Sequence, residues 1–160
     1  MDDFAQVCQL YYFKVYRFLL RLSGSDQQAE DLTQEVFYKA LLHIGQYRDS
    51  GHMFTWLCTI GKNAWLSECR KQKRTLPLEE LPAQEGQSME EAYLKRERRQ
   101  ALRRALLDLP EPYQEVVILH VYGGVPLREI AQRRGKSESW GKVTYFRAKQ
   151  LLKERLEELR

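Results

Sequence analysis

The sequence predicts an all-α protein made of two small helical domains, the second of which contains a helix-turn-helix. Apolar residues recur at spacings of three and four along most of the chain, which is the period of an amphipathic helix. The few glycines and prolines gather between these segments, and no stretch alternates apolar and polar residues as a strand would. The 160 residues are enough for two domains of about 70 residues each.

The first half of the chain predicts an N-terminal domain over residues 1–74. The apolar face of its first helix is formed by Phe4, Val7, Tyr11, Val15, Phe18 and Leu22. A Ser-Gly pair ends this helix, and Ser25 opens the next one through a capping box with Gln28. The buried stripe of the second helix is formed by Ala29, Leu32, Val36, Ala40 and Ile44.

A third helix and a linker complete this half. The helix is expected from Phe54 to Arg70, after a polar break at residues 47–52. Proline, glycine and acidic residues then accumulate over residues 75–90, a composition typical of domain boundaries. We therefore expect a flexible acidic linker there and a second domain over residues 91–160.

The second half predicts four further helices. A charged helix over residues 89–109 precedes a second one that contains the apolar residues of the segment 116–121. A short helix over residues 127–133, a turn at Gly135 and a long helix capped by Ser137 then form a helix-turn-helix pattern. Gly135 suits the turn because it adopts a positive φ without a Cβ penalty.

The final helix is expected to present one face to its domain and a basic face to solvent. The inner face is formed by Gly141, Tyr145, Ala148 and Leu152, and the outer face by Lys142, Phe146, Lys149 and Lys153. Lysines on the outer face can neutralise phosphates while the first turns of the helix enter a major groove. This pattern favours a DNA-binding module over a helical hairpin with a solvated charged face.

The distribution of charge indicates two separate contacts with nucleic acid. The chain has a formal net charge of +4, and its basic residues gather over residues 62–74 and 128–149. An acidic stretch between these blocks contains Glu79, Glu80, Glu85, Glu90 and Glu91. Basic blocks of this kind contact DNA phosphates, and the acidic stretch holds them apart as a linker would.

Several other classes of function are disfavoured by the sequence. The chain contains three cysteines (Cys8, Cys58 and Cys69) and three histidines (His43, His52 and His120). Their spacings fit no disulfide framework and no common zinc site. No phosphate-binding loop, nucleophile motif, secretory signal or long apolar run is visible. We therefore expect a cytoplasmic protein with no catalytic residues, no metal, no cofactor and no membrane insertion.

Three stretches, in this order, resemble the extracytoplasmic-function (group IV) sigma factors of the sigma-70 family. Residues 29–37 (AEDLTQEVF) look like the family's core-binding helix, and residues 54–63 (FTWLCTIGKN) look like its −10-reading segment. The chain from Leu109 onward, through residues 127–131 (LREIA) and 137–140 (SESW), looks like its −35-reading domain. The resemblance implies an RNA polymerase sigma factor that directs promoter recognition and transcription initiation.

The resemblance also implies three sets of contact residues. Those that bind the clamp helices of the polymerase β′ subunit are Asp31, Gln34, Glu35 and Tyr38. Those that bind the −10 element, including a pocket for an unstacked base, are Tyr47, Arg48, Asp49, Ser50, Gly51, Lys62, Asn63 and Arg70. Those that bind the −35 element are Ser137, Glu138, Lys142, Val143, Phe146 and Arg147.

Further partners and two departures follow from the same resemblance. It implies docking of the C-terminal domain on the polymerase β flap and an anti-sigma factor that covers these surfaces. Gly141 stands where a β-branched residue is usual, and Thr144 stands where a basic residue is common. Close helix packing beside Trp140 is the expected reason for Gly141, since glycine otherwise weakens a helix.

Two other functions remain open from the residues alone. The first is a helix-turn-helix regulator that binds an operator as a dimer without polymerase, which leaves the acidic face over residues 31–35 unexplained. The second is an interaction module, either an anti-sigma decoy or a degenerate sigma factor that binds polymerase without reading DNA. Gly141 and Thr144 are its best support. An enzyme is a distant third class, because no site for one is visible.

Overall fold

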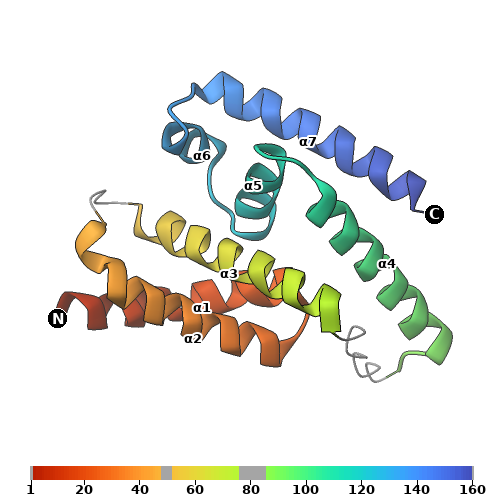
Figure 1. The fold of residues 1–160 in the computed structure, drawn as a ribbon, viewed down its shortest axis with the longest axis horizontal. Coiled ribbons are helices and arrows are strands. Elements are labelled where there is room, and N and C mark those ends of the chain that lie inside the picture. Colours follow the sequence, from red (N-terminus) through yellow and green to blue (C-terminus); the bar gives the residue numbers. More distant parts are fainter. Residues whose placement is uncertain (1, 48–51, 76–85, 160) are drawn as a thin grey trace.

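The computed structural model describes residues 2–47, 52–75 and 86–159, and every regular element in these ranges is a helix (Figure 1). The all-α class is therefore confirmed for the described chain. Two expectations fall outside the described residues: the −10 positions from Arg48 to Gly51, and most of the acidic linker.

The N-terminal half forms three long helices around a shared apolar core. They are α1 (Asp2–Ser23), α2 (Asp26–His43) and α3 (Met53–Thr75), and a 3-10 turn, η1 (Ile44–Gln46), follows α2. The largest buried side chains of this core are Val15, Phe18, Leu19, Val36, Leu57 and Trp65. These side chains lie on the inner faces of the helices, and burying those faces against one another packs the three helices together.

The start of α2 shows how a short polar sequence sets a helix boundary. The Ser25 hydroxyl accepts a hydrogen bond from the Gln28 amide at 3.2 Å, as the cap prediction requires. The reciprocal half of the expected capping box is wrong, because the Ser25 amide donates to Ser23 Oγ at 3.3 Å. The Gln28 side-chain nitrogen is buried without a hydrogen-bond partner.

The C-terminal half contains a long entry helix and a compact helix-turn-helix unit. Its elements are α4 (Met89–Asp108), α5 (Tyr113–Val117), a π-helical turn η2 (Ile118–Tyr122), α6 (Leu127–Arg133) and α7 (Glu138–Glu158). The Ser88 hydroxyl caps α4 by accepting from the Glu91 amide at 3.1 Å. The bounds of α6 are those predicted, whereas the widening of the helix at η2 was not predicted.

Gly141 is explained by the contact between α6 and α7. A Cβ atom at Gly141 would lie 3.0 Å from the Leu127 carbonyl oxygen and 3.5 Å from Ala131 Cβ. The absent side chain therefore lets the two helices of the helix-turn-helix approach closely. The expectation of close packing was correct, but the partner is the start of α6 rather than the neighbouring Trp140.

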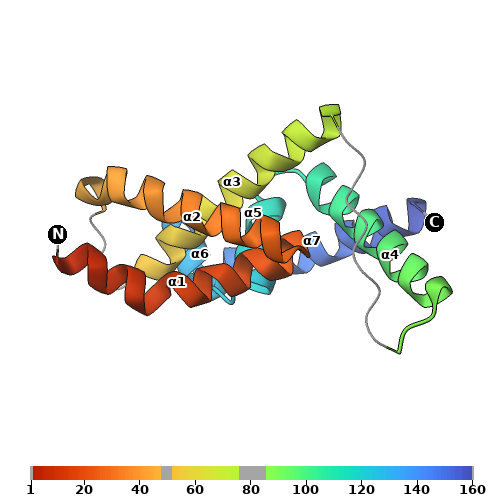
Figure 2. The ribbon, with the colours of Figure 1, turned by 90° about the horizontal axis from the view of Figure 1, so that it is seen from below.

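The two halves share one continuous hydrophobic core instead of standing apart. In both views α5 lies against the N-terminal helices, whereas α4 extends to one side (Figure 1, Figure 2). The backbone at Gly123 lies close to the N-terminal helices, since an added Cβ atom would lie 3.5 Å from both Cys58 Sγ and Phe18 Cδ1. The contact surface of α1 and α3 with η2, together with the contacts of α3 with Glu115 of α5 and Glu129 of α6, is called the interdomain seam.

Candidate nucleic-acid interface

The helix-turn-helix presents a mixed apolar and basic face at the start of α7. Val143 is 48% exposed and Phe146 is 58% exposed. Lys142 and Arg147 are exposed beside them, and Lys142 lies 3.9 Å from Glu138 in a loose ion pair. Such a face suits a major groove, where cations meet guanine or phosphate and apolar groups meet thymine methyls.

The opposite face of α7 is fixed in place by packing. Gly141, Thr144 and Ala148 are buried against the rest of the unit, so the rotation of α7 about its axis is determined. Thr144 is only 5% exposed, and a charged side chain there would be costly to bury. The burial of this position gives a physical reason for the absence of a basic residue.

The turn before α7 has the geometry that its sequence predicts. Gly135 has a φ of +68°, and the Lys136 amide donates to the Ala131 carbonyl at 2.8 Å. The Ser137 hydroxyl then accepts from the Trp140 amide at 3.2 Å and caps α7. Ser137 and Glu138 are both exposed, so the first turn of α7 is open to a ligand.

The second basic segment lies on α3, and its cations differ in accessibility. Asn63 and Arg70 are exposed, as a contact with DNA requires. Lys62 is only 6% exposed, and its ammonium lies 3.5 Å from the Glu115 carboxylate of α5. The side chains at 62 and 63 therefore point to different surroundings, although they are adjacent in sequence.

Tyr47 lies beside the start of α3. Its ring packs against Trp56 with a centroid separation of 5.2 Å, and its hydroxyl accepts from the His52 amide at 3.1 Å. The aromatic ring is therefore held in position at the edge of the described chain before α3. The predicted base pocket also includes positions 48–51, which lie outside the described residues.

The acidic face of α2 is exposed over its whole length. Asp31, Gln34, Glu35 and Tyr38 all point away from the core, and Tyr38 is 64% exposed. Glu35 pairs with Lys39 at 3.0 Å, and Asp31 accepts from Gln27 at 3.1 Å. Both contacts are local and leave carboxylate oxygens available to a partner.

Two apolar residues extend this acidic face and were missed from the sequence. Leu41 is 46% exposed and Leu42 is 60% exposed, directly after the acidic turns of α2. Their position off the stripe formed by Val36 and Ala40 is the signal that could have identified them. The face therefore combines carboxylates with exposed leucines.

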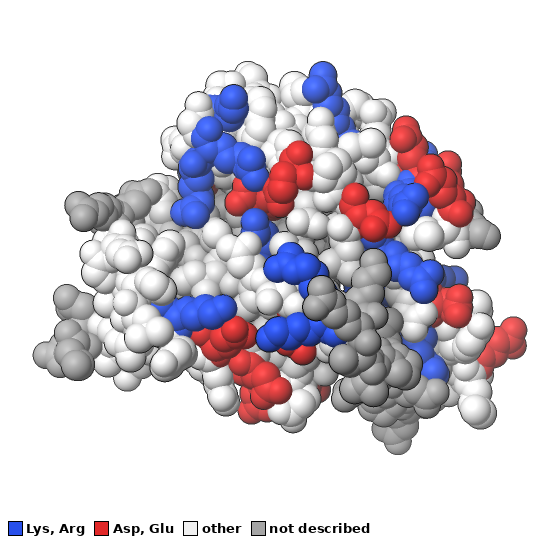
Figure 3. Space-filling view, viewed as in Figure 1, with Lys and Arg blue, Asp and Glu red and all other residues white. Residues whose placement is uncertain are grey.

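The surface carries two groups of cationic side chains, as two separate contacts with DNA would. Cationic side chains gather over α6 and the start of α7, a second group lies along α3, and an acidic group lies between them (Figure 3). Glu111 and Glu115 pair with Arg134, directly after α6.

The cysteines are structural. Cys58 and Cys69 are buried, and all three cysteines are free thiols. Burial raises the pKa of the Cys58 and Cys69 thiols, which keeps them protonated and weakly nucleophilic. Among the residues described here, no three histidine, cysteine or carboxylate side chains are grouped as a metal site would need. None of the described helices has the length and apolarity to cross a membrane.

Taken together, the helix-turn-helix, the second basic helix and the exposed acidic face define a two-domain transcription factor of the class that binds both DNA and protein. Two family models match the chain, "Sigma-70 region 2" over residues 8–75 and "Sigma-70, region 4" over residues 99–152. The chain belongs to the extracytoplasmic-function group of the sigma-70 family, whose members are transcription initiation factors that direct RNA polymerase to promoters.

Known relatives extend this similarity along the whole chain. The ECF RNA polymerase sigma factor SigM of Bacillus subtilis is 29% identical, over 92% of this chain and 91% of the relative. The ECF sigma factor SigW of the same organism is 27% identical, over 99% of this chain and 91% of the relative. The fold is similar to the sigma factor RpoE from Bartonella quintana, solved in complex with the anti-sigma factor NepR. The TM-score is 0.59 at 26% identity, over 98% of both chains.

Proposed function

We propose that the two halves of this sigma factor divide promoter recognition between them. The domain over residues 1–74 binds core polymerase and the −10 element, and the domain over residues 91–160 binds the −35 element. The observation that carries this proposal is the face of α7, where Val143 and Phe146 are exposed between cations while the opposite face is buried.

On the −35 side, the roles follow from side-chain chemistry. Arg147 and Lys142 are suited to guanine edges or phosphates, and Val143 and Phe146 are suited to thymine methyl groups. Ser137 and Glu138 lie in the first turn of α7, which enters a groove first in this kind of module. The exposed cations of α6, Arg128 and Arg133, are suited to contact the DNA backbone and so to set the orientation.

On the −10 side, Asn63 is proposed to hydrogen-bond the exposed edge of an unstacked base, because its amide supplies both a donor and an acceptor. Tyr47 supplies an aromatic face on which a base can stack. Arg70 is exposed and is proposed to hold a phosphate of the opening strand, and the positions from Arg48 to Gly51 are proposed to complete the pocket. Lys62 is buried and paired with Glu115, so its proposed phosphate contact requires that this pair breaks.

The acidic face of α2 is proposed to bind the clamp helices of the polymerase β′ subunit. Asp31 and Glu35 attract basic side chains, while Tyr38 supplies contact area at the centre of the face. Leu41 and Leu42 add an apolar contribution to the same surface. The C-terminal domain docks on the β flap.

A location and a further partner are also proposed for this factor. The factor acts in the cytoplasm, where its polymerase and promoter are, and catalyses no reaction of its own. An anti-sigma factor is proposed as a further partner, since the structurally similar RpoE was solved in complex with one.

Run-off transcription with purified core polymerase tests this function. A template library randomised at the −35 and −10 positions is transcribed with and without the factor. Specific templates should be transcribed only in its presence, and Arg147→Ala and Asn63→Ala should each reduce that selection about 10- to 100-fold at one element. DNA binding without any factor-dependent transcription would instead support a free-standing regulator.

Lys149→Ala is a matched control for Arg147→Ala, because it removes an exposed cation of α7 outside the proposed base contacts. It should weaken binding to all templates alike without changing which templates are selected.

A further inference from the structure

The helix α4 carries the densest group of cations in the chain, and no role has been assigned to it. Residues 95–104 contain six lysine and arginine side chains and one carboxylate, and no other ten-residue stretch contains as many cations. The two matching family models cover residues 8–75 and 99–152, so the first ten residues of α4 lie outside both. The helix also lies outside the interdomain seam. It is therefore a candidate for a contact that the −10 and −35 elements do not account for.

One face of α4 combines an aromatic ring with cations. Polar residues at spacings of three and four share this face, and we call them the α4 outer row: Tyr93, Arg96, Gln100 and Arg104. On the opposite face Ala105 and Leu106 are buried, so packing fixes the direction in which the row points. The Tyr93 side chain is 55% exposed, and Arg104 is exposed at the other end of the row.

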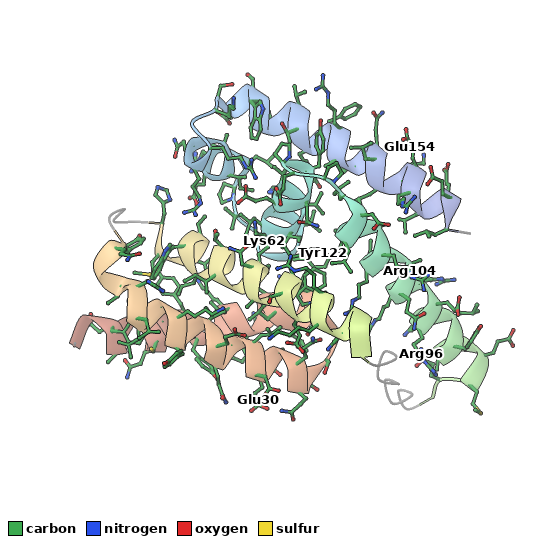
Figure 4. All side chains as sticks on the ribbon, in the orientation of Figure 1. Glu30, Lys62, Arg96, Arg104, Tyr122 and Glu154 are labelled. Carbon is green, nitrogen blue, oxygen red and sulfur yellow. The ribbon has the colours of Figure 1, made fainter. Side chains whose placement is uncertain are left out.

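The two ends of the α4 outer row are available to a ligand. Figure 4 labels Arg96 and Arg104 on α4, and in the same orientation Figure 3 also shows cationic side chains along this helix. Within the described chain, Tyr93 and Arg104 make no hydrogen bond, ring contact or ion pair. By contrast, Arg99 donates to the Gly24 carbonyl at 3.4 Å and Arg103 donates to Gln72 Oε1 at 2.7 Å, so these two side chains are held against the N-terminal half.

The start of α4 is held in a helix by local contacts and does not need the outer row for packing. The Ser88 hydroxyl accepts a hydrogen bond from the Glu91 amide at 3.1 Å and caps the helix. Glu90 and Glu91 lie in the first turn, where their charge is favourable at the positive end of the helix dipole. A tyrosine with a packing role would bury its ring, whereas Tyr93 leaves more than half of its surface in solvent.

The side chains of the α4 outer row suit a single strand of nucleic acid. Cations attract the phosphates, and an exposed tyrosine ring stacks on an unpaired base whatever its identity. A duplex keeps its bases stacked inside, so it could use the cations of the row but not the ring. Tyr93 and Arg104 are eleven residues apart, or about 16 Å along the helix, which is the length of about five nucleotides.

We propose that the α4 outer row is a sequence-independent site for single-stranded nucleic acid, separate from the proposed −10 and −35 contacts. Tyr93 stacks on an unpaired base, and Arg96 and Arg104 attract the phosphates that follow it along the strand. A transcript and a separated promoter strand present the same phosphates and bases, and only the sugar hydroxyl tells them apart.

Fluorescence anisotropy on the full chain tests the ring of this site. The probes are labelled oligothymidylate and oligouridylate of about 20 nucleotides, longer than the row. Tyr93→Ala should weaken binding about tenfold, because one stack between a base and a ring is lost, and Tyr93→Phe should bind as the wild type does. Phe13→Ala is the matched control: Phe13 is 61% exposed on α1, but Arg17 already covers its ring at 4.8 Å, so its loss should change nothing.

The salt dependence of binding tests the cations of the site. Arg104→Gln should weaken binding and reduce the slope of log K against log salt concentration by about 0.7, the contribution of one phosphate contact on a single strand. Tyr93→Ala should leave this slope unchanged, since it removes no charge. Arg17→Gln removes an exposed cation of α1 outside the row and should change neither affinity nor slope. Circular dichroism confirms that each variant is folded.

Tighter binding of oligouridylate would identify a transcript as the occupant, and tighter binding of oligothymidylate a separated promoter strand. If Tyr93→Ala and Arg104→Gln bound both probes as tightly as the wild type, the site would be overturned. Weaker binding of Tyr93→Ala to core polymerase, with unchanged affinity for both probes, would make the row a protein-docking surface and would overturn it equally. The proposed function is tested separately, because Tyr93→Ala should select the same templates as the wild type in run-off transcription.

Discussion

The helices α3 and α7 carry similar basic segments, but the structure treats them in opposite ways. On α3 the face that contains Lys62 is covered by the other half of the chain. On α7 the face that contains Phe146 is open to solvent. The charge of a helix predicts what it can bind, whereas the packing of its neighbours decides which of its side chains a ligand can reach.

The largest expected difference between the two helices concerns their aromatic residues. Trp65→Ala should lower the free energy of unfolding by about 3–5 kcal/mol, because the Trp65 side chain of α3 is fully buried in the hydrophobic core. Phe146→Ala should change it by no more than about 0.5 kcal/mol and should weaken binding to the selected −35 duplex. Urea denaturation and a duplex-binding assay measure the two effects. Equal losses of stability would show that Phe146 is packed in solution.

A smaller difference is expected for one lysine on each helix. Lys62→Met should lower the free energy of unfolding by about 1–3 kcal/mol, because it leaves the buried Glu115 with Arg134 alone. Lys142→Met should cost at most about 0.5 kcal/mol, since its pair with Glu138 is exposed. Thermal and urea denaturation under matched salt measure both. If the two variants lost the same stability, Lys62 would be solvated and the comparison would fail.

The smallest expected effect concerns the caps that begin α2 and α7. Ser25→Ala and Ser137→Ala should each lower the free energy of unfolding by about 1 kcal/mol. In each case the hydroxyl accepts a hydrogen bond from the backbone amide three residues later, and the substitution leaves that amide without its cap. Only Ser137→Ala should also weaken binding to the −35 duplex, since its cap orders the first turn of α7. A similar loss of duplex binding from both variants would indicate a general effect of stability.

Local features of the fold could be predicted from the sequence because they depend on neighbouring residues. The bounds of α6, the cap at Ser137 and the positive φ of Gly135 were all predicted. The end of α3 was placed at Arg70, although the helix continues to Thr75, because a run of lysines and arginines favours a helix without adding to its buried face.

The features that escaped prediction depend on contacts between distant parts of the chain. The π-helical turn at η2 brings Gly123 against Phe18, and neither its widening nor this contact has a local signal. The surroundings of Lys62 are set by Glu115, more than fifty residues away in the sequence. The two exposed faces of α2 and α7 were predicted from periodicity, whereas the covering of α3 was not.

The single core shared by both halves has a thermodynamic consequence for any partner that opens the molecule. Separating the halves exposes Leu119, Phe18 and Gly123 to water, and the hydrophobic effect opposes that exposure. A partner that held the two halves apart would therefore have to cover these apolar side chains with its own surface. Each half is in this sense part of the folded core of the other.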